Sequence, residues 1–217
     1  MSDMIKDLSE LRLNYQKGEL LEAQVDALPH EQFLIWFNQA LEAQLHEPYA
    51  MSLATANAQG RPHVRTVLLR GATEVGYDFY TNYDSQKGLD LAANPYAELL
   101  FYWPELERQV RISGRVEKIS KEESTTYYHK RPRDSQIAAH ISTPQSGVIA
   151  SRDLLEQRFH ALQTELAQTE AAKPEFWGGY RLAASYFEFW QGRPNRLHDR
   201  LSYQLIDGQW QLQRLMP

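Results

Sequence analysis

The feature that most constrains the fold is a recurring pattern in which two segments of strand character are joined by a short turn. The pairs are residues 50–57 with 62–70, 96–103 with 107–119, and 198–206 with 209–215. The last pair is joined by Asp207-Gly208, a dipeptide that strongly favours a two-residue hairpin turn. Because a hairpin places its two strands antiparallel, the pattern predicts an antiparallel sheet.

Helical segments lie between and around these strand pairs. Further strands are expected at residues 77–82 and 180–190, with a turn between Gly71 and Gly76. Helices are expected at residues 3–15, 30–45, 84–94, 120–131, 133–141 and 151–168. Ser120-Lys121-Glu122-Glu123 has the pattern of a capping box, which marks a helix start. Helices grouped around hairpins predict an α+β protein built on an antiparallel barrel.

Composition excludes several classes of function. A chain of 217 residues fits one domain or two small ones. The absence of cysteine excludes disulfides, a thiol nucleophile and thiolate metal sites, and it suits a reducing cytosol, so we expect a cytoplasmic protein. The N-terminal residues lack the apolar core of a signal peptide, and no apolar run approaches the roughly 18 residues of a membrane span. A net charge of −5 argues against a nucleic-acid partner.

Four clusters of basic and hydroxyl side chains stand out in this acidic chain. They are Arg65 with Arg70, Lys87 in a helical first turn, Tyr127 with Arg131 and Ser135, and Arg196 with His198 and Arg200. The third cluster has a helical spacing of four residues, so its phenol, guanidinium and hydroxyl are predicted to converge on a phosphate. Each cluster alone is more often a solvated surface. Their number favours two separate anion sites.

The fourth cluster follows an aromatic strand and a turn at Gly192 and Pro194. In an extended segment, alternate side chains share a face, so Arg196, His198 and Arg200 are predicted to point the same way. Guanidinium groups bind carboxylate or phosphate oxygens, and an imidazole can donate, accept or transfer a proton near neutral pH. The competing interpretation is a surface edge strand with solvated charges.

Several common catalytic motifs are absent from the sequence. There is no glycine-rich phosphate loop, no G-x-G-x-x-G fingerprint and no G-x-S-x-G elbow. The seven histidines show no metal-ligand spacing, so no metal site is predicted. Aromatic residues make up 12%, which suits a flat conjugated cofactor and a packed core equally well. The residues alone therefore indicate an α+β barrel protein whose ligands carry phosphate.

Several motifs in order resemble those of the pyridoxamine/pyridoxine 5′-phosphate oxidase family, and the likeness covers nearly the whole chain. The motifs are Arg131-Pro132-Arg133-Asp134-Ser135-Gln136-Ile137, Glu107-Arg108-Gln109-Val110, Phe176-Trp177-Gly178-Gly179-Tyr180, Glu188-Phe189-Trp190-Gln191-Gly192 and Arg196-Leu197-His198-Asp199-Arg200. The resemblance implies an antiparallel split β-barrel with flanking helices, formed by residues 1–217 as one FMN-binding domain. It also implies a mobile N-terminal segment at residues 1–19 and a dimerisation and substrate-site region at residues 174–217.

The resemblance further implies which residues bind each ligand. FMN is expected at the interface of a homodimer, in contact with Arg65, Thr66, Val67, Leu68, Leu69, Arg70, Tyr80, Thr81, Gln86, Lys87, Gln109, Gln145, Ser146, Trp190 and Arg200. The substrate is expected to contact Arg12, Tyr15, Arg70, Tyr127, Arg131, Ser135, Arg196 and His198, and the last two are the expected catalytic residues. Family members commonly carry lysine where Arg70 stands and a basic residue where Gln86 stands.

The implied reaction is the FMN-dependent oxidation of pyridoxamine or pyridoxine 5′-phosphate by O₂, which yields pyridoxal 5′-phosphate and H₂O₂ and, from the amine, ammonia. One alternative keeps the fold and makes the chain a flavin reductase or an oxidoreductase with another substrate. A second alternative is a protein that binds pyridoxal phosphate or flavin without turning it over. A structural or nucleic-acid-binding role has little support, because the net charge of the chain is negative.

Overall fold

The computed structural model describes residue 8 and residues 13–217, and residues 1–7 and 9–12 lie outside the described part. The chain divides into two compact units. We call residues 49–101 and 112–186 the central unit, and residues 1–48, 102–111 and 187–217 the terminal unit. The boundaries fall inside three strands, so β5, β6 and β7 each contribute residues to both units.

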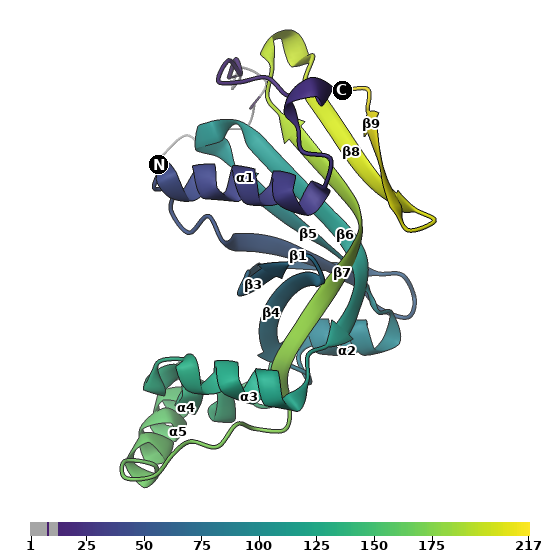
Figure 1. The fold of residues 1–217 in the computed structure, drawn as a ribbon. Helices are drawn as coiled ribbons and strands as arrows, with labels where there is room; N and C mark the ends of the chain where they lie inside the picture. The colour runs from purple at the N-terminus through teal and green to yellow at the C-terminus, as the bar shows by residue number, and fades with distance from the viewer. Residues whose placement is uncertain (1–7, 9–12) are drawn as a thin grey trace. The chain divides into compact units, whose positions relative to one another are not determined.

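The central unit is built on an antiparallel sheet (Figure 1). The strand order is β2-β1-β5-β6-β7-β4-β3. The strands are β1 (Ala50–Ala56), β2 (Pro62–Leu68), β3 (Gly71–Thr73), β4 (Gly76–Asn82), β5 (Tyr96–Trp103), β6 (Arg108–Lys118) and β7 (Trp177–Gln191). The first predicted hairpin is present, and its register runs from Ala50 opposite Leu68 to Ala56 opposite Pro62. Alternate residues of β1 are buried, so one face of the strand packs into the core.

Three helices of the central unit begin at a serine whose side chain caps them. Ser85 caps α2 (Gln86–Ala93), Ser120 caps α3 (Lys121–Lys130) and Ser151 caps α5 (Arg152–Glu165). The predicted capping box is confirmed, since Ser120 Oγ accepts a hydrogen bond from the N–H of Glu123 at 3.1 Å. Helix α4 (Arg133–Ile141) lies side by side with α5 (Figure 1).

Aromatic side chains form the core of the terminal unit. Helix α1 (Pro29–Glu42) contributes Trp36, whose ring meets Phe189 of β7 at 5.3 Å, and Phe189 in turn meets Tyr203 at 5.7 Å. Strand β8 (Asp199–Ile206) pairs with β7 and with β9 (Gln209–Arg214). The turn between β8 and β9 has φ values of 50° at Asp207 and 78° at Gly208, which fits the predicted two-residue hairpin. Short 3₁₀ turns lie at Glu22–Gln24, Pro104–Leu106 and Pro194–Arg196.

The structure corrects the prediction between Gly71 and Gly76. The segment is not only a turn, because Gly71–Thr73 pairs with β4 as strand β3. Three residues are too few to show a period of two, which is why the pattern missed them. Most of the helix predicted at residues 3–15 lies outside the described residues, and Leu13–Tyr15 are not helical. No helix in the described part of the chain has the length and apolar character needed to span a bilayer.

Candidate active site

The central unit contains a cavity of about 350 Å³, which we call the central cavity. Side chains from β2, β4, α2, α3, β7 and the loop after α4 line it. The lining residues are Arg65, Thr66, Val67, Leu68, Arg70, Tyr80, Thr81, Asn82, Lys87, Tyr127, Arg131, Gln145 and Trp177. Four of them are cations, and the unit therefore concentrates positive charge in one cavity of an acidic protein.

Arg65 and Lys87 are both held by hydrogen bonds within the central unit. Arg65 Nη1 donates to the carbonyl oxygen of Leu53 at 3.0 Å and to Thr55 Oγ1 at 2.8 Å. Lys87 Nζ donates to Thr81 Oγ1 at 3.1 Å and to Ser85 Oγ at 3.2 Å. Burial lowers the pKa of Lys87, and the nearby charge of Arg65 lowers it further. An anion bound between the two cations would relieve that repulsion.

Arg131 lies in the same cavity and lacks a hydrogen-bond partner for one buried nitrogen. Its guanidinium carbon stands 4.6 Å from the centre of the Trp177 ring, and its Nη1 is buried without a partner among the described residues. Burial lowers the pKa of Arg131. Gln145 Oε1, also in the lining, is buried without a described partner. Buried polar atoms are normally satisfied, so these two mark a place for a polar ligand.

The predicted trio on α3 and α4 is only partly brought together. Tyr127 and Arg131 both line the central cavity, whereas Ser135 is not among its lining residues. Arg131 is the C-cap of α3 and has an extended backbone, so the two side chains share the cavity without continuous helical spacing. Tyr127 stacks on Tyr80 with ring centres 3.8 Å apart. Ser135 lies in the first turn of α4, where its N–H donates to the carbonyl of Pro132.

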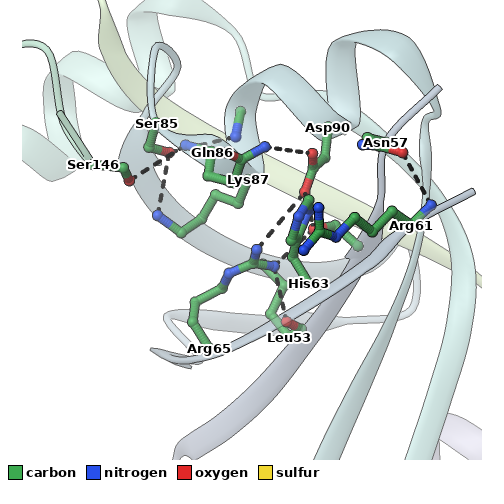
Figure 2. A network of polar contacts seen from close by, with 12 residues as sticks. Leu53, Asn57, Arg61, His63, Arg65, Ser85, Gln86, Lys87, Asp90 and Ser146 are labelled. Carbon is green, nitrogen blue, oxygen red and sulfur yellow. Dashed lines mark hydrogen bonds and ion pairs between the residues drawn. The ribbon is translucent and has the colours of Figure 1, made fainter. Parts of the chain in front are cut away.

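Three other predicted cofactor residues of this unit, Leu69, Gln86 and Ser146, are not among the lining residues of the cavity. Leu69 is buried. Gln86 Nε2 donates to Asp90 Oδ1 at 3.0 Å, and the N–H of Gln86 donates to Ser146 Oγ at 3.4 Å (Figure 2). The side chain of Gln86 therefore contacts a buried carboxylate within α2, and Gln86 is not among the lining residues of the cavity.

The terminal unit has its own cavity of about 770 Å³, which we call the terminal cavity. Its lining residues are Leu13, Asn14, Tyr15, Arg193, Asn195, Arg196 and His198. The predicted substrate residues Tyr15, Arg196 and His198 are therefore together here. Arg12 lies outside the described residues.

The prediction of one extended row at Arg196, His198 and Arg200 is wrong. Residues Pro194–Arg196 form a 3₁₀ turn, and Asn195 and Arg196 have φ values of 59° and 61°. The strand begins only at Asp199. Arg200 instead pairs with Glu188 at 2.9 Å and donates to the carbonyl of Met216 at 2.7 Å. Gly192 and Pro194 before the row indicated a turn, but they did not show how far the turn extends.

His198 is fixed in one protonation pattern. Its Nδ1 accepts a hydrogen bond from the N–H of Arg193 at 3.1 Å, so the proton of the neutral ring sits on Nε2. Its ring lies 4.7 Å from that of Trp190 and 5.6 Å from that of Tyr15. Burial lowers the pKa of His198, and the charge of Arg196 lowers it further. The imidazole is therefore a neutral donor at neutral pH.

The remaining predicted residues of the terminal unit are placed as follows. Gln109 is half-buried on β6, Trp190 is half-buried on β7, and Arg200 is on β8. None of the three lines the terminal cavity. The prediction missed Asn82 and Trp177 in the central cavity, and Asn14 and Arg193 in the terminal cavity. Trp177 belongs to a motif already noted, Phe176-Trp177-Gly178-Gly179-Tyr180, which was the available signal.

Comparison with solved structures defines the class of fold. The structure of PhzG from Burkholderia lata 383, in complex with tetrahydrophenazine-1-carboxylic acid, matches with a TM-score of 0.87 and 27% identity, covering 93% of this chain and 100% of that one. A pyridoxamine 5′-phosphate oxidase-related, FMN-binding protein from Nostoc punctiforme matches with a TM-score of 0.69 and 19% identity, covering 88% and 98%. The chain thus has the antiparallel split-barrel fold, as predicted.

Sequence comparison then gives the family within that class. Residues 37–165 match the protein-family model described as pyridoxamine 5′-phosphate oxidase. Residues 177–217 match the family model of a pyridoxine 5′-phosphate oxidase C-terminal dimerisation region. The pyridoxine/pyridoxamine 5′-phosphate oxidase of Acinetobacter baylyi is 77% identical over the full length of both chains. The protein of that name from Deinococcus deserti is 56% identical, over 97% of this chain and 99% of its own. The chain belongs to the pyridoxine/pyridoxamine 5′-phosphate oxidase family.

Proposed function

We propose that this protein oxidises pyridoxamine and pyridoxine 5′-phosphate with bound FMN and O₂, giving pyridoxal 5′-phosphate and H₂O₂, and ammonia from the amine. The observation that carries the proposal is the content of the central cavity. One cavity of about 350 Å³ contains Arg65 with Lys87 and also Arg70 with Arg131. Two pairs of cations suit two phosphate groups, one on the flavin and one on the substrate.

Arg65 and Lys87 are the proposed ligands of the FMN phosphate. Their hydrogen bonds go to neutral oxygens of their own unit, and Arg65 also lies 3.8 Å from the carboxylate of Asp90, which leaves Lys87 and the outer donors of Arg65 for an anion. Contacts to the rest of FMN are proposed for Thr66, Val67, Leu68, Leu69, Arg70, Tyr80, Thr81, Gln86, Gln109, Gln145, Ser146, Trp190 and Arg200. FMN supplies the redox chemistry by accepting hydride equivalents and passing them to O₂, and the protein supplies binding and orientation.

Arg131 and Tyr127 are the proposed ligands of the substrate phosphate, together with Ser135 and Arg70. Arg131 Nη1 is buried without a described partner, and a phosphate oxygen would provide the acceptor it lacks. The stack of Arg131 on Trp177 leaves the edge of the guanidinium plane available for such an oxygen. A substrate held by its phosphate has its reacting carbon confined to a small region, which is the orientation that the oxidation requires.

Arg196 and His198 are the proposed catalytic residues, and Tyr15 and Arg12 are proposed to contact the substrate. His198 presents a neutral Nε2–H, because Nδ1 is already engaged by the N–H of Arg193. Arg196 carries a permanent positive charge. A donor and a cation next to the pyridine ring would stabilise the charge that changes as hydride leaves the substrate. No general base is assigned, since the substrate amine or alcohol can lose its proton to water.

We also propose that the working form is a cytoplasmic homodimer with FMN at the subunit interface. The match of residues 177–217 to a dimerisation region supports the assembly. Residues 174–217 would then serve both dimerisation and the substrate site.

The proposal is tested by an absorbance spectrum of the purified protein before and after anaerobic addition of pyridoxamine 5′-phosphate. The expected result is a flavin band that bleaches with substrate and returns when air is admitted, with formation of H₂O₂. A flavin band that the substrate leaves unchanged would favour a flavin reductase. A colourless protein that cannot take up added FMN would reject both and favour a protein that binds pyridoxal phosphate without turnover.

A further inference from the structure

Arg65 is connected to a buried carboxylate through a single hydroxyl group. Its Nη1 donates to Thr55 Oγ1 at 2.8 Å, and Thr55 Oγ1 donates to Asp90 Oδ2 at 2.7 Å. Arg65 Nη2 lies 3.8 Å from the same carboxylate oxygen. Nε and Nη2 of Arg65 meet no hydrogen-bond acceptor among the described residues. The inner side of the guanidinium is therefore held, and donors remain for a ligand.

Asp90 is well suited to hold that position because its own carboxylate is fixed from three sides. Its side chain is 1% exposed. Thr55 and His63 donate to Oδ2, the latter from Nδ1 at 2.9 Å, and Gln86 donates to Oδ1 at 3.0 Å. Burial alone would raise the pKa of Asp90, but the hydrogen bonds from Thr55, Gln86 and His63 outweigh it and hold the pKa below its ordinary value. The carboxylate is therefore a fixed negative charge.

The direction of each hydrogen bond follows from the chemistry of the groups. An ionised carboxylate only accepts, and a guanidinium only donates. The one hydroxyl proton of Thr55 must therefore point to Asp90, and its lone pairs are left for Arg65. Both hydrogen bonds have a charged member, which makes them stronger than bonds between neutral groups. Asp90 therefore selects the hydroxyl orientation in which the proton points to the carboxylate and a lone pair faces Arg65.

We propose that Asp90 and Thr55 are positioning residues for the FMN phosphate, acting through Arg65. This inference rests on the proposed function, in which Arg65 binds that phosphate. The carboxylate orients the hydroxyl, the hydroxyl and the Leu53 carbonyl fix Nη1, and the outer donors of Arg65 are presented to the central cavity next to Lys87. Gln86 contributes by donating to the other oxygen of Asp90, which helps to hold the carboxylate in place.

A competing interpretation is that Asp90 only joins α2 to β1. The two interpretations differ in what they predict for a flavin without a phosphate. Loss of packing would weaken FMN and riboflavin alike. Loss of Arg65 orientation would weaken FMN alone, because riboflavin has the same ring and ribityl chain but no anion for Arg65 to bind.

The test measures dissociation constants of FMN and riboflavin by flavin fluorescence, using the full-length protein stripped of flavin. For Thr55→Val, which keeps the shape and removes the hydroxyl, we expect FMN binding to be weakened about tenfold and riboflavin binding to be unchanged. Thr55→Ser restores the hydroxyl and should restore FMN affinity. Equal weakening of both flavins, or no change for FMN, would overturn the inference.

A second pair of variants examines Asp90 itself. Asp90→Ala should raise the dissociation constant of FMN at least as much as Thr55→Val does. The double variant should bind FMN as tightly as Asp90→Ala alone, because both changes act through one guanidinium. Additive losses of affinity would contradict the inference.

Glu98→Gln is the matched control. Glu98 faces away from Thr55, since its partner on β1 is Ala54, and it accepts a hydrogen bond from Ser113. It should leave FMN affinity unchanged. If the unaltered protein binds no FMN, the proposed function fails first.

Discussion

The two cavities hold their functional side chains by different means. In the central cavity, Arg65 extends from the middle of a strand and Lys87 from the first turn of a helix, and each donates to two oxygens of the same unit. In the terminal cavity, Arg196 belongs to a three-residue turn and has a φ of 61°, and His198 precedes the first residue of β8. One site is supported by regular structure and the other by an irregular connection.

The contrast indicates a division of labour between binding and turnover. Phosphate binding needs charges at fixed places, and strands and helices provide fixed places. Left-handed backbone at a residue other than glycine costs about 1–3 kcal/mol, and such conformations cluster at sites where geometry serves the reaction. We therefore expect substitutions in the central cavity to change affinities, and substitutions at Arg196 and His198 to change rates.

The largest effect is expected for Arg131→Met. The substitution removes a buried guanidinium and keeps an apolar side chain over Trp177, so the substrate phosphate loses a charge-assisted partner. KM for pyridoxamine 5′-phosphate should rise about 100-fold with little change in kcat. Steady-state H₂O₂ production measures both constants. Arg133→Met is the control, because Arg133 donates to the carbonyl of Leu166 and does not line the cavity. A fall in kcat at constant KM would break the proposed division.

The next effect is expected for Arg196→Lys. Lysine keeps the charge but loses the planar fork, so the stabilisation of the changing charge on the substrate should decline while substrate affinity is maintained. The rate of flavin bleaching under anaerobic stopped-flow conditions should fall about tenfold. Substrate affinity, taken from the concentration dependence of that rate, should stay within the range of the parent protein. A change confined to affinity would place Arg196 with the phosphate-binding residues instead.

Much of the fold follows from local sequence signals. Asp207-Gly208 specifies its hairpin because both residues adopt positive φ, and Ser120 specifies the start of α3 by capping it. Strand β3 escapes prediction because its three residues are defined by the partner β4 and not by any pattern of their own. The division into two units also has no local signal, since its boundaries pass through continuous strands.

The candidate sites were predictable to the extent that charge and spacing determine them. Tyr127 and Arg131 share a cavity as predicted, although Arg131 lies just past the end of α3 and not in continuous helical spacing with Tyr127. The row at residues 196–200 failed because a turn with two left-handed residues replaced the assumed strand. Asp90 could not be recognised from the sequence, because an aspartate in a short helix is usually a solvated charge. Only the structure shows that its carboxylate is buried and hydrogen-bonded to Thr55 and His63.

A smaller and pH-dependent effect is expected at Lys87. Its pKa lies below the roughly 10.4 of a free lysine, because burial and the charge of Arg65 both disfavour the ammonium form. The folded protein therefore loses this charge at a lower pH than a free lysine would, and FMN affinity should decline as the pH rises toward 10. The decline should be absent for riboflavin, and in Lys87→Arg it should move to higher pH. Flavin fluorescence titrations across this range check it, and parallel curves for both flavins would contradict it.

The smallest effect is expected for Trp177→Phe, which tests whether the ring beneath Arg131 contributes to substrate binding. The guanidinium carbon lies 4.6 Å from the indole centre, and phenylalanine offers a weaker face to a cation. KM for pyridoxamine 5′-phosphate should rise about threefold, with FMN affinity and kcat unchanged. Trp210→Phe is the matched control, since Trp210 packs on Phe187 and lines neither cavity. A loss of kcat at Trp177→Phe would show that the central cavity also controls turnover, and the contrast between the two cavities would then have to be abandoned.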